Sequence, residues 1–191
     1  MEDLELQPGS YFLVSAHREE NVDSPERLRD LLATLNALAE RYGQRVVVST
    51  HPRTRRRLQE LGAPDPADGR IEFRKPFGFL DWVKLESSAA CVLSDSGTLT
   101  EESSILGFPA VMIRDSHERP EGMDEGTVVM AGLGRERVLQ AVDLVQAHGQ
   151  AGPRAFRIVP DYEAEAVSKK VVRIILSYID YVNRVVWGKR T

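Results

Sequence analysis

The chain has 191 residues, of which 42% are hydrophobic and 28% charged, and its formal net charge is −4. This length is sufficient for one domain with a sizeable core, and the lack of a basic excess excludes nucleic acid as the expected main partner. A single cysteine, Cys91, excludes an internal disulfide. No apolar run is long enough to span a bilayer, and the opening MEDLELQPGS lacks the apolar core of a signal peptide. We therefore expect a cytoplasmic protein.

Strand-like and helix-like patterns alternate along the chain. Short apolar runs typical of buried strands occur at 11–16, 45–50, 71–76, 91–96, 109–115 and 127–132. Helices are predicted from residue 25, at 53–61, 79–89 and 98–107, after residue 134, and at roughly 162–187. By composition 62–69 is a loop, and 116–126 is a connection with more charge than a turn requires. The arginines of the second predicted helix are interpreted as a solvated helix face: Arg53, Arg55, Arg56 and Arg57.

Strands that are apolar throughout and alternate with helices indicate a parallel sheet covered on both faces, an α/β fold of the doubly wound, Rossmann-like class. Right-handed crossovers place the carboxyl ends of all strands along one edge, and ligands of such sheets bind outside that edge. Three of the four histidines follow strands: His17 the first, His51 the second and His117 the fifth. The turn Asp95-Ser96-Gly97 follows the fourth strand, so the sequence predicts a site at this edge.

The segment SDSGTLTEESS (94–104) can be interpreted in two ways. Gly97 permits close backbone approach, and the free N–H groups of a helix start attract an anion, to which the Ser96 and Thr98 hydroxyls could also donate. Alternatively, Thr98 and Glu101 form a capping box. The two interpretations are compatible, and we expect the cap and the anion site to share this helix start. Asp95 would repel a phosphate, so beside one it has to turn away or accept hydrogen bonds from the backbone.

Other residues at this edge also have two interpretations each. Glu102, one turn into the helix, could accept from ribose hydroxyls or merely favour the helix start. His17 could donate to a diphosphate or exchange a proton with a sugar, or it is an ordinary surface histidine; His51 is similar but weaker. Arg119 offers a planar donor fork suited to phosphate, or belongs to a charged surface loop. The spacing of the histidines and Asp95 does not support a metal site.

Five segments, SAHREEN, STHPRTRRRL, PFGFLDW, SDSGTLTEESSILGFPAVMIRDSHERPEG and GTVVMAGL, resemble the carboxyl-terminal half of the non-hydrolysing UDP-N-acetylglucosamine 2-epimerase family. They span most of residues 11–134, and the long fourth segment is highly specific. HREEN, SDSGT and the ending YVNRVVWGK resemble most closely the branch that makes UDP-N-acetyl-L-fucosamine for capsule and O-antigen synthesis.

The resemblance implies one half of a B-type glycosyltransferase fold, with a long carboxyl-terminal helix, that holds UDP or a UDP-2-acetamido sugar. It implies that Ser96 and Gly97 contact the diphosphate, that Glu102 binds the ribose, and that the backbone near Phe79 and Leu80 meets the uracil. Arg119 and His17 complete the diphosphate and catalytic surroundings. His51, with Arg18 beside the catalytic histidine, matches a region linked in some relatives to a second, activating nucleotide sugar.

Family chemistry is elimination of UDP followed by its re-addition with C2 inverted, without a redox cofactor or a metal. The acids assigned to proton transfer belong to an amino-terminal domain that this sequence lacks, so we expect residues 1–10 to be a linker remnant and 11–191 a UDP-binding domain that is inactive alone. The last helix carries more apolar residues than a solitary helix needs, which predicts an apolar patch at 174–187 covered by the missing half or by a homodimer partner. The alternatives are a stand-alone nucleotide-sugar-binding module, half of a glycosyltransferase, or a structural domain in which these residues are caps and surface charges.

Overall fold

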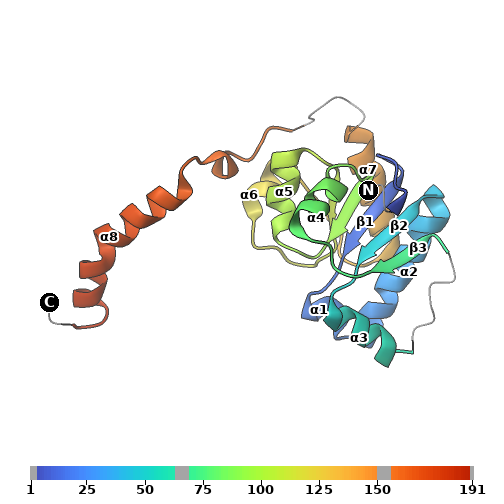
Figure 1. The fold of residues 1–191 in the computed structure, drawn as a ribbon, viewed down its shortest axis with the longest axis horizontal. Helices are drawn as coiled ribbons and strands as arrows, with labels where there is room; N and C mark the ends of the chain where they lie inside the picture. Colours follow the sequence, from blue (N-terminus) through green and yellow to red (C-terminus); the bar gives the residue numbers. More distant parts are fainter. Residues whose placement is uncertain (1–3, 63–68, 150–155, 190–191) are drawn as a thin grey trace. The chain divides into compact units, whose positions relative to one another are not determined.

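The computed structural model describes residues 4–62, 69–149 and 156–189 (Figure 1). The chain divides into two compact units, Met1–Val159 and Pro160–Thr191. The first unit contains the sheet and the helices that cover it, and the second contains a short 3-10 helix (Pro160–Glu163) and the long helix α8 (Val167–Val185). The predicted loop at 62–69 lies largely outside the described residues.

In the described part of the first unit, six strands form one parallel sheet in the order β3-β2-β1-β4-β5-β6. This confirms the predicted doubly wound α/β class, since a parallel sheet that starts in the middle and winds outward in both directions has this order. The strands are β1 (Tyr11–Ser15), β2 (Arg45–Ser49), β3 (Ile71–Arg74), β4 (Cys91–Ser94), β5 (Ala110–Met112) and β6 (Val129–Met130).

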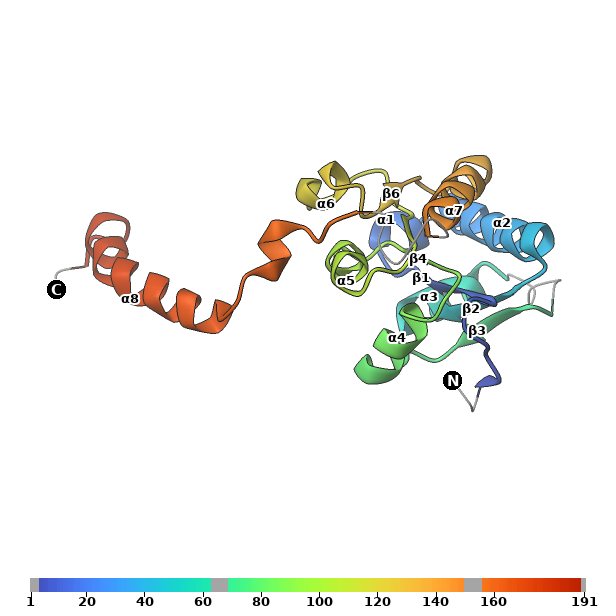
Figure 2. The ribbon, with the colours of Figure 1, turned by 90° about the horizontal axis from the view of Figure 1, so that it is seen from above.

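Helices cover both faces of the sheet (Figure 2). They are α1 (Glu19–Val22), α2 (Pro25–Tyr42), α3 (Pro52–Glu60), α4 (Phe79–Glu86), α5 (Thr98–Leu106), α6 (Pro120–Asp124) and α7 (Arg135–Gly149). Alternate residues of one strand enter different cores because strand side chains point to opposite faces. Phe12 and Val14 pack with α2 and α7, whereas Tyr11 and Leu13 pack with α4 and α5.

Local sequence explains where the long helix α2 begins and ends. The Ser24 side chain accepts a hydrogen bond from the Arg27 N–H (3.4 Å), and Pro25 occupies the first turn, where no N–H is needed. Gly43 ends the helix at a φ of 64°, which glycine adopts without strain. The short helices α1 and α6 were not predicted, because each has too few residues to show a helical period.

The second unit carries the apolar surface that the sequence predicts. Apolar side chains throughout α8 are exposed, and those of the predicted patch at 174–187 include Ile174, Ile175, Leu176, Tyr178, Ile179, Tyr181, Val185, Val186 and Trp187. Within the second unit these side chains are therefore uncovered, and the partner that would cover them remains a prediction. Across the described ranges, no helix combines the length and the apolar character that crossing a membrane would require.

Candidate functional site

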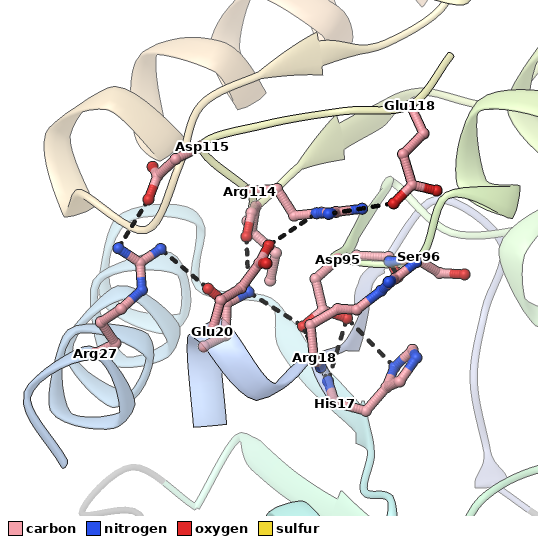
Figure 3. A network of polar contacts seen from close by, with 12 residues as sticks. His17, Arg18, Glu20, Arg27, Asp95, Ser96, Arg114, Asp115 and Glu118 are labelled. Atoms are coloured by element: carbon pink, nitrogen blue, oxygen red, sulfur yellow. Dashed lines mark hydrogen bonds and ion pairs between the residues drawn. The ribbon is translucent and has the colours of Figure 1, made fainter. Parts of the chain in front are cut away.

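The candidate site lies where the strand order reverses direction. Strands β1 and β4 are far apart in the sequence but adjacent in the sheet, with Ser15 paired to Ser94 at their carboxyl ends. One connection leaves this point toward β2 and the other toward β5, so a crevice can open between them. His17 and Ser96 follow these two strand ends directly (Figure 3).

Asp95, which the sequence left without a role, joins the two loops at this point. Its side chain is fully buried and accepts hydrogen bonds from the backbone N–H groups of His17 (3.0 and 3.1 Å) and Arg18 (2.9 Å). The buried Asn21 side chain donates to Asp95 at 3.1 Å and to the Ile113 carbonyl at 2.9 Å. The carboxylate therefore accepts backbone hydrogen bonds, as predicted for an acid in this turn. In doing so it fixes the loop that carries His17.

The two imidazoles of the predicted site lie close together, with ring centroids 6.1 Å apart. His17 Nδ1 is 3.3 Å from Asp95 Oδ1, so a proton on Nδ1 is stabilised and Nε2 is the nitrogen that can accept from a ligand. His51 has the opposite arrangement, since its Nδ1 accepts from the Arg53 N–H (3.3 Å) at the start of α3. Nε2 of His51 is therefore a donor while His51 is neutral.

Gly97 permits a close approach, but the group that approaches it in this structure is the Arg119 side chain. A Cβ atom at Gly97 would lie 2.2 Å from Nη1 of Arg119, so only glycine leaves room for the guanidinium there. The Arg119 Nε donates to Glu101 Oε1 at 2.5 Å, and Glu118 is 3.9 Å from Nη1. The predicted diphosphate residues Gly97 and Arg119 are thus brought together.

The predicted capping box at the start of α5 is wrong. No side chain caps this helix, and Glu101 pairs with Arg119 instead of turning back to the helix start. The Thr98 hydroxyl lies 3.0 Å from the Ser96 hydroxyl. The Leu99 and Thr100 N–H groups donate to the Ser96 and Gly97 carbonyls at 3.3 Å each. Within the described residues, the N–H groups of Gly97 and Thr98 are therefore the backbone donors at this helix start that an anion can use.

Glu102, the predicted ribose residue, lies one turn further along α5 and is half-buried. Burial raises the pKa of its carboxyl, and a hydrogen bond from the Thr98 side chain acts in the opposite direction. A second carboxyl, that of Glu86 on α4, contacts Glu102, and burial together with this negative neighbour raises the pKa of Glu86 to about 8. Sequence reasoning missed Glu86, although an acid four residues after Trp82 on the apolar face of a helix was a usable signal.

The two residues predicted to meet a uracil stand at the same edge, at the start of α4. Phe79 and Leu80 are 74% and 80% exposed, which is unusual for large apolar side chains. Gly78 precedes them as the residue before the helix. Backbone donors and acceptors therefore lie beside an uncovered apolar surface.

Arginines near the site differ in how they are held. Arg114, after β5, is buried and pairs with Glu20 (2.9 Å), and its Nη1 has no hydrogen-bond acceptor within the described residues. The α3 arginines, predicted to form a solvated face, differ in exposure: Arg55 and Arg56 are exposed, whereas two others are partly covered and ion-paired. Arg53 and Arg57 are half-buried and both bind Asp23, and the hydrogen bond from Arg53 is the main cause of the lowered pKa of that carboxyl.

The candidate site coincides neither with the large cavity of the first unit nor with a cluster of metal ligands in the described residues. A cavity of about 830 Å³ lies away from it, lined by residues near the amino ends of the strands such as Gly9, Ala90 and Ala110. Within the ranges the structure describes, no three His, Cys, Asp or Glu side chains are grouped so as to hold a metal ion. The candidate site is therefore an open edge with donors and carboxylates.

Comparison with known proteins connects this geometry to a family. Residues 1–176 match the family model described as UDP-N-acetylglucosamine 2-epimerase. The solved UDP-N-acetylglucosamine 2-epimerase from Rickettsia bellii is 47% identical, with a TM-score of 0.82 over 98% of this chain and 50% of that one. The enzyme from Methanocaldococcus jannaschii, solved with UDP-GlcNAc and UDP, is 31% identical, with a TM-score of 0.79 over 87% of this chain and 45% of that one.

A heptosyltransferase from E. coli, solved with ADP, shares the fold alone, at 16% identity and a TM-score of 0.52 over 73% of this chain and 45% of that one. These likenesses confirm that the sheet and its helices have the architecture of one half of a B-type glycosyltransferase fold. The chain spans about half the length of the relatives it matches. With the match over residues 1–176, the chain belongs to the UDP-N-acetylglucosamine 2-epimerase family.

Proposed function

We propose that this chain is the UDP-binding half of a nucleotide-sugar 2-epimerase, with UDP or a UDP-2-acetamido sugar as its ligand. The observation that carries the proposal is the meeting of three groups at the switch point of the sheet. These are the Ser96-Gly97 turn at a helix start, the Arg119 guanidinium packed against it, and the His17 imidazole held by Asp95. A relative solved with UDP-GlcNAc and UDP supports a ligand of this class.

The proposed ligand runs along the sheet edge from α5 to α4. The diphosphate accepts from the Ser96 hydroxyl and from N–H groups at the start of α5, and Arg119 supplies positive charge beside it. The ribose hydroxyls donate to Glu102, and the uracil lies against the backbone at Phe79 and Leu80. The exposure of those two side chains supports a ligand or partner surface there.

The reaction we propose is elimination and re-addition at the sugar. A base removes the C2 proton, the C1–oxygen bond breaks, and UDP leaves with the electron pair; UDP then returns as a proton is delivered to the other face of C2. This chain stabilises the negative charge that develops on the leaving diphosphate, through Arg119 and the start of α5. His17 exchanges a proton through Nε2, while Asp95 holds its Nδ1.

The remaining acids for proton transfer belong, in this proposal, to an amino-terminal half that faces the same edge. Residues 1–10 are then a linker, 11–191 is the UDP-binding domain, and this domain is inactive alone. The motifs HREEN and SDSGT favour UDP-N-acetyl-L-fucosamine formation among the family's activities. Arg18 and His51 are the residues we assign to a second nucleotide sugar.

The apolar face of α8 is the proposed contact with the partner. Its exposed side chains, Ile175, Ile179 and Trp187 among them, form a surface that water does not favour. The amino-terminal half is the occupant we propose, since relatives are about twice as long as this chain. A homodimer partner is the alternative.

Titration of the chain with UDP by isothermal calorimetry tests the binding proposal. We expect saturable binding to the wild type and a loss of about tenfold or more in Glu102→Gln, since the amide is a weaker acceptor for two hydroxyls. The exposed Glu40→Gln on α2 serves as the control and should bind like the wild type. Absence of binding in the wild type would refute the proposal and leave a structural domain.

Complementation distinguishes an epimerase half from a stand-alone binding module or half of a glycosyltransferase. The chain is mixed with a separately expressed amino-terminal half of a family member, and inversion at C2 of a UDP-2-acetamido sugar is followed by NMR. Inversion that requires both halves supports the proposal. UDP binding without inversion favours the stand-alone module, and transfer of the sugar to an acceptor favours the glycosyltransferase.

A further inference from the structure

The carboxyl of Glu86 is buried without a hydrogen-bond donor. Glu86 is the last residue of α4, its exposed fraction is 0%, and neither Oε1 nor Oε2 has a hydrogen-bond partner within the described residues. An ionised carboxylate in such surroundings is strongly disfavoured, so the group is kept neutral or acquires a partner. Its surroundings decide which.

The group that faces Glu86 is another carboxyl, that of Glu102 on α5. The two side chains interact directly, and the Trp82 indole on α4 approaches both. Two carboxylates both accept and cannot bond to each other, whereas one proton between them forms a strong hydrogen bond. Glu101, the other charged group acting on Glu102, is occupied by Arg119.

The proton resides on the more deeply buried member of this pair. Glu86 is fully buried, while Glu102 is half-buried, reaches the ligand edge and receives a hydrogen bond from Thr98. Burial raises the pKa of Glu86 to about 8, so at neutral pH Glu86 is the donor and Glu102 the acceptor. One oxygen of Glu102 thereby accepts a hydrogen bond from Glu86, on the side away from the ligand edge.

We propose that Glu86 is a positioning residue for Glu102: its protonated carboxyl donates a hydrogen bond that aims the Glu102 carboxylate at the two vicinal hydroxyls of a ligand. The inference rests on the proposed function, in which Glu102 is the ribose acceptor. It deepens that function by making nucleotide affinity depend on the protonation of a group that touches no ligand. When Glu86 ionises, the hydrogen bond is replaced by repulsion, and Glu102 turns away from the hydroxyls or takes up a proton.

The test is UDP affinity, measured by calorimetry on the full chain between pH 6 and pH 9.5. We expect wild-type affinity to fall by about tenfold as the pH rises through about 8, because one hydrogen bond to a charged group is lost. In Glu86→Gln the amide still donates, so affinity at pH 7 stays within about twofold of the wild type and the fall is absent. Glu86→Leu, which cannot donate, should bind about tenfold more weakly at every pH.

Controls separate this inference from the proposed function and from misfolding. Ionisation of UDP itself affects all variants alike, so the ratio of wild type to Glu86→Gln isolates Glu86. Thermal unfolding of each variant establishes that it is folded. If the wild type binds UDP but Glu86→Leu binds equally well with the same pH profile, the inference is overturned and the proposed function stands. If the wild type does not bind UDP at any pH, both fall.

Discussion

Replacement of Asp95 by asparagine tests whether one buried carboxylate organises the site. In the wild type, N–H groups of His17, Arg18 and Asn21 donate to the Asp95 carboxylate. The substitution keeps the shape of the side chain but replaces one acceptor oxygen by an amide NH2, which faces these donors. A hydrogen bond to a charged group contributes about 1.5–3 kcal/mol, and breaking a buried charged network costs roughly 3–5 kcal/mol. We therefore expect Asp95→Asn to lower the free energy of unfolding by about 3 kcal/mol.

Urea denaturation followed by circular dichroism measures this cost, and the melting temperature should fall by roughly 6–12 °C for a unit of this size. UDP affinity should also fall, because the loop carrying His17 loses its anchor. Asp115→Asn is the matched control: its ion pair with Arg27 (2.8 Å) is largely exposed, so its loss should cost under about 1 kcal/mol. Equal stability losses in the two variants would refute the reasoning that Asp95 holds the site.

Three further predictions concern other parts of the chain. Gly97→Ala should displace the Arg119 guanidinium, since its Cβ would lie 2.2 Å from Nη1. UDP binding should weaken by about tenfold, while the free energy of unfolding changes by under about 1 kcal/mol. Unchanged affinity would show that UDP binding does not use the contact between Gly97 and Arg119. The pKa of Glu86 is raised to about 8, so between pH 4.5 and 8 this carboxyl ionises in the unfolded state but stays protonated in the folded state. The free energy of unfolding of the wild type should therefore fall with rising pH over this range, at up to about 1.4 kcal/mol per pH unit. Glu86→Gln should flatten this slope in urea titrations at several pH values, and an identical slope would contradict the burial argument. Ile179→Glu places a charge on the exposed face of α8 and should reduce association of the chain with itself or with an amino-terminal half. Analytical ultracentrifugation measures this association, and an unchanged result would exclude this face as the contact.

The fold class follows directly from the sequence because its signals are local. Runs such as RVVVS alternate with helical periods, and both patterns survive in the structure as β2 and its neighbouring helices. The carboxyl-end rule then placed His17, His51 and Ser96 at one edge, and the structure brings them there. Short elements were missed: α1 and α6 have too few residues to establish a period.

Parts of the candidate site could not be predicted, since they depend on which side chains meet across elements. The choice of Glu101 between a cap and an ion pair was decided by where Arg119 lies, and Arg119 is 18 residues away in sequence. The partner of Asp95 was equally invisible, because His17 is 78 residues away. Glu86 reads as an ordinary helix residue until α5 places a second carboxyl against it.

The sequence by itself determined the alternation of strands and helices, the edge where the candidate site residues gather, and the apolar character of the last helix. These depend on hydrophobic period and on chain direction, which neighbouring residues specify. Only the tertiary structure decided that β1 and β4 are adjacent, so that Asp95 could anchor the loop of His17. Strand order depends on the packing of distant segments against one another, and this packing decides which polar groups are buried together.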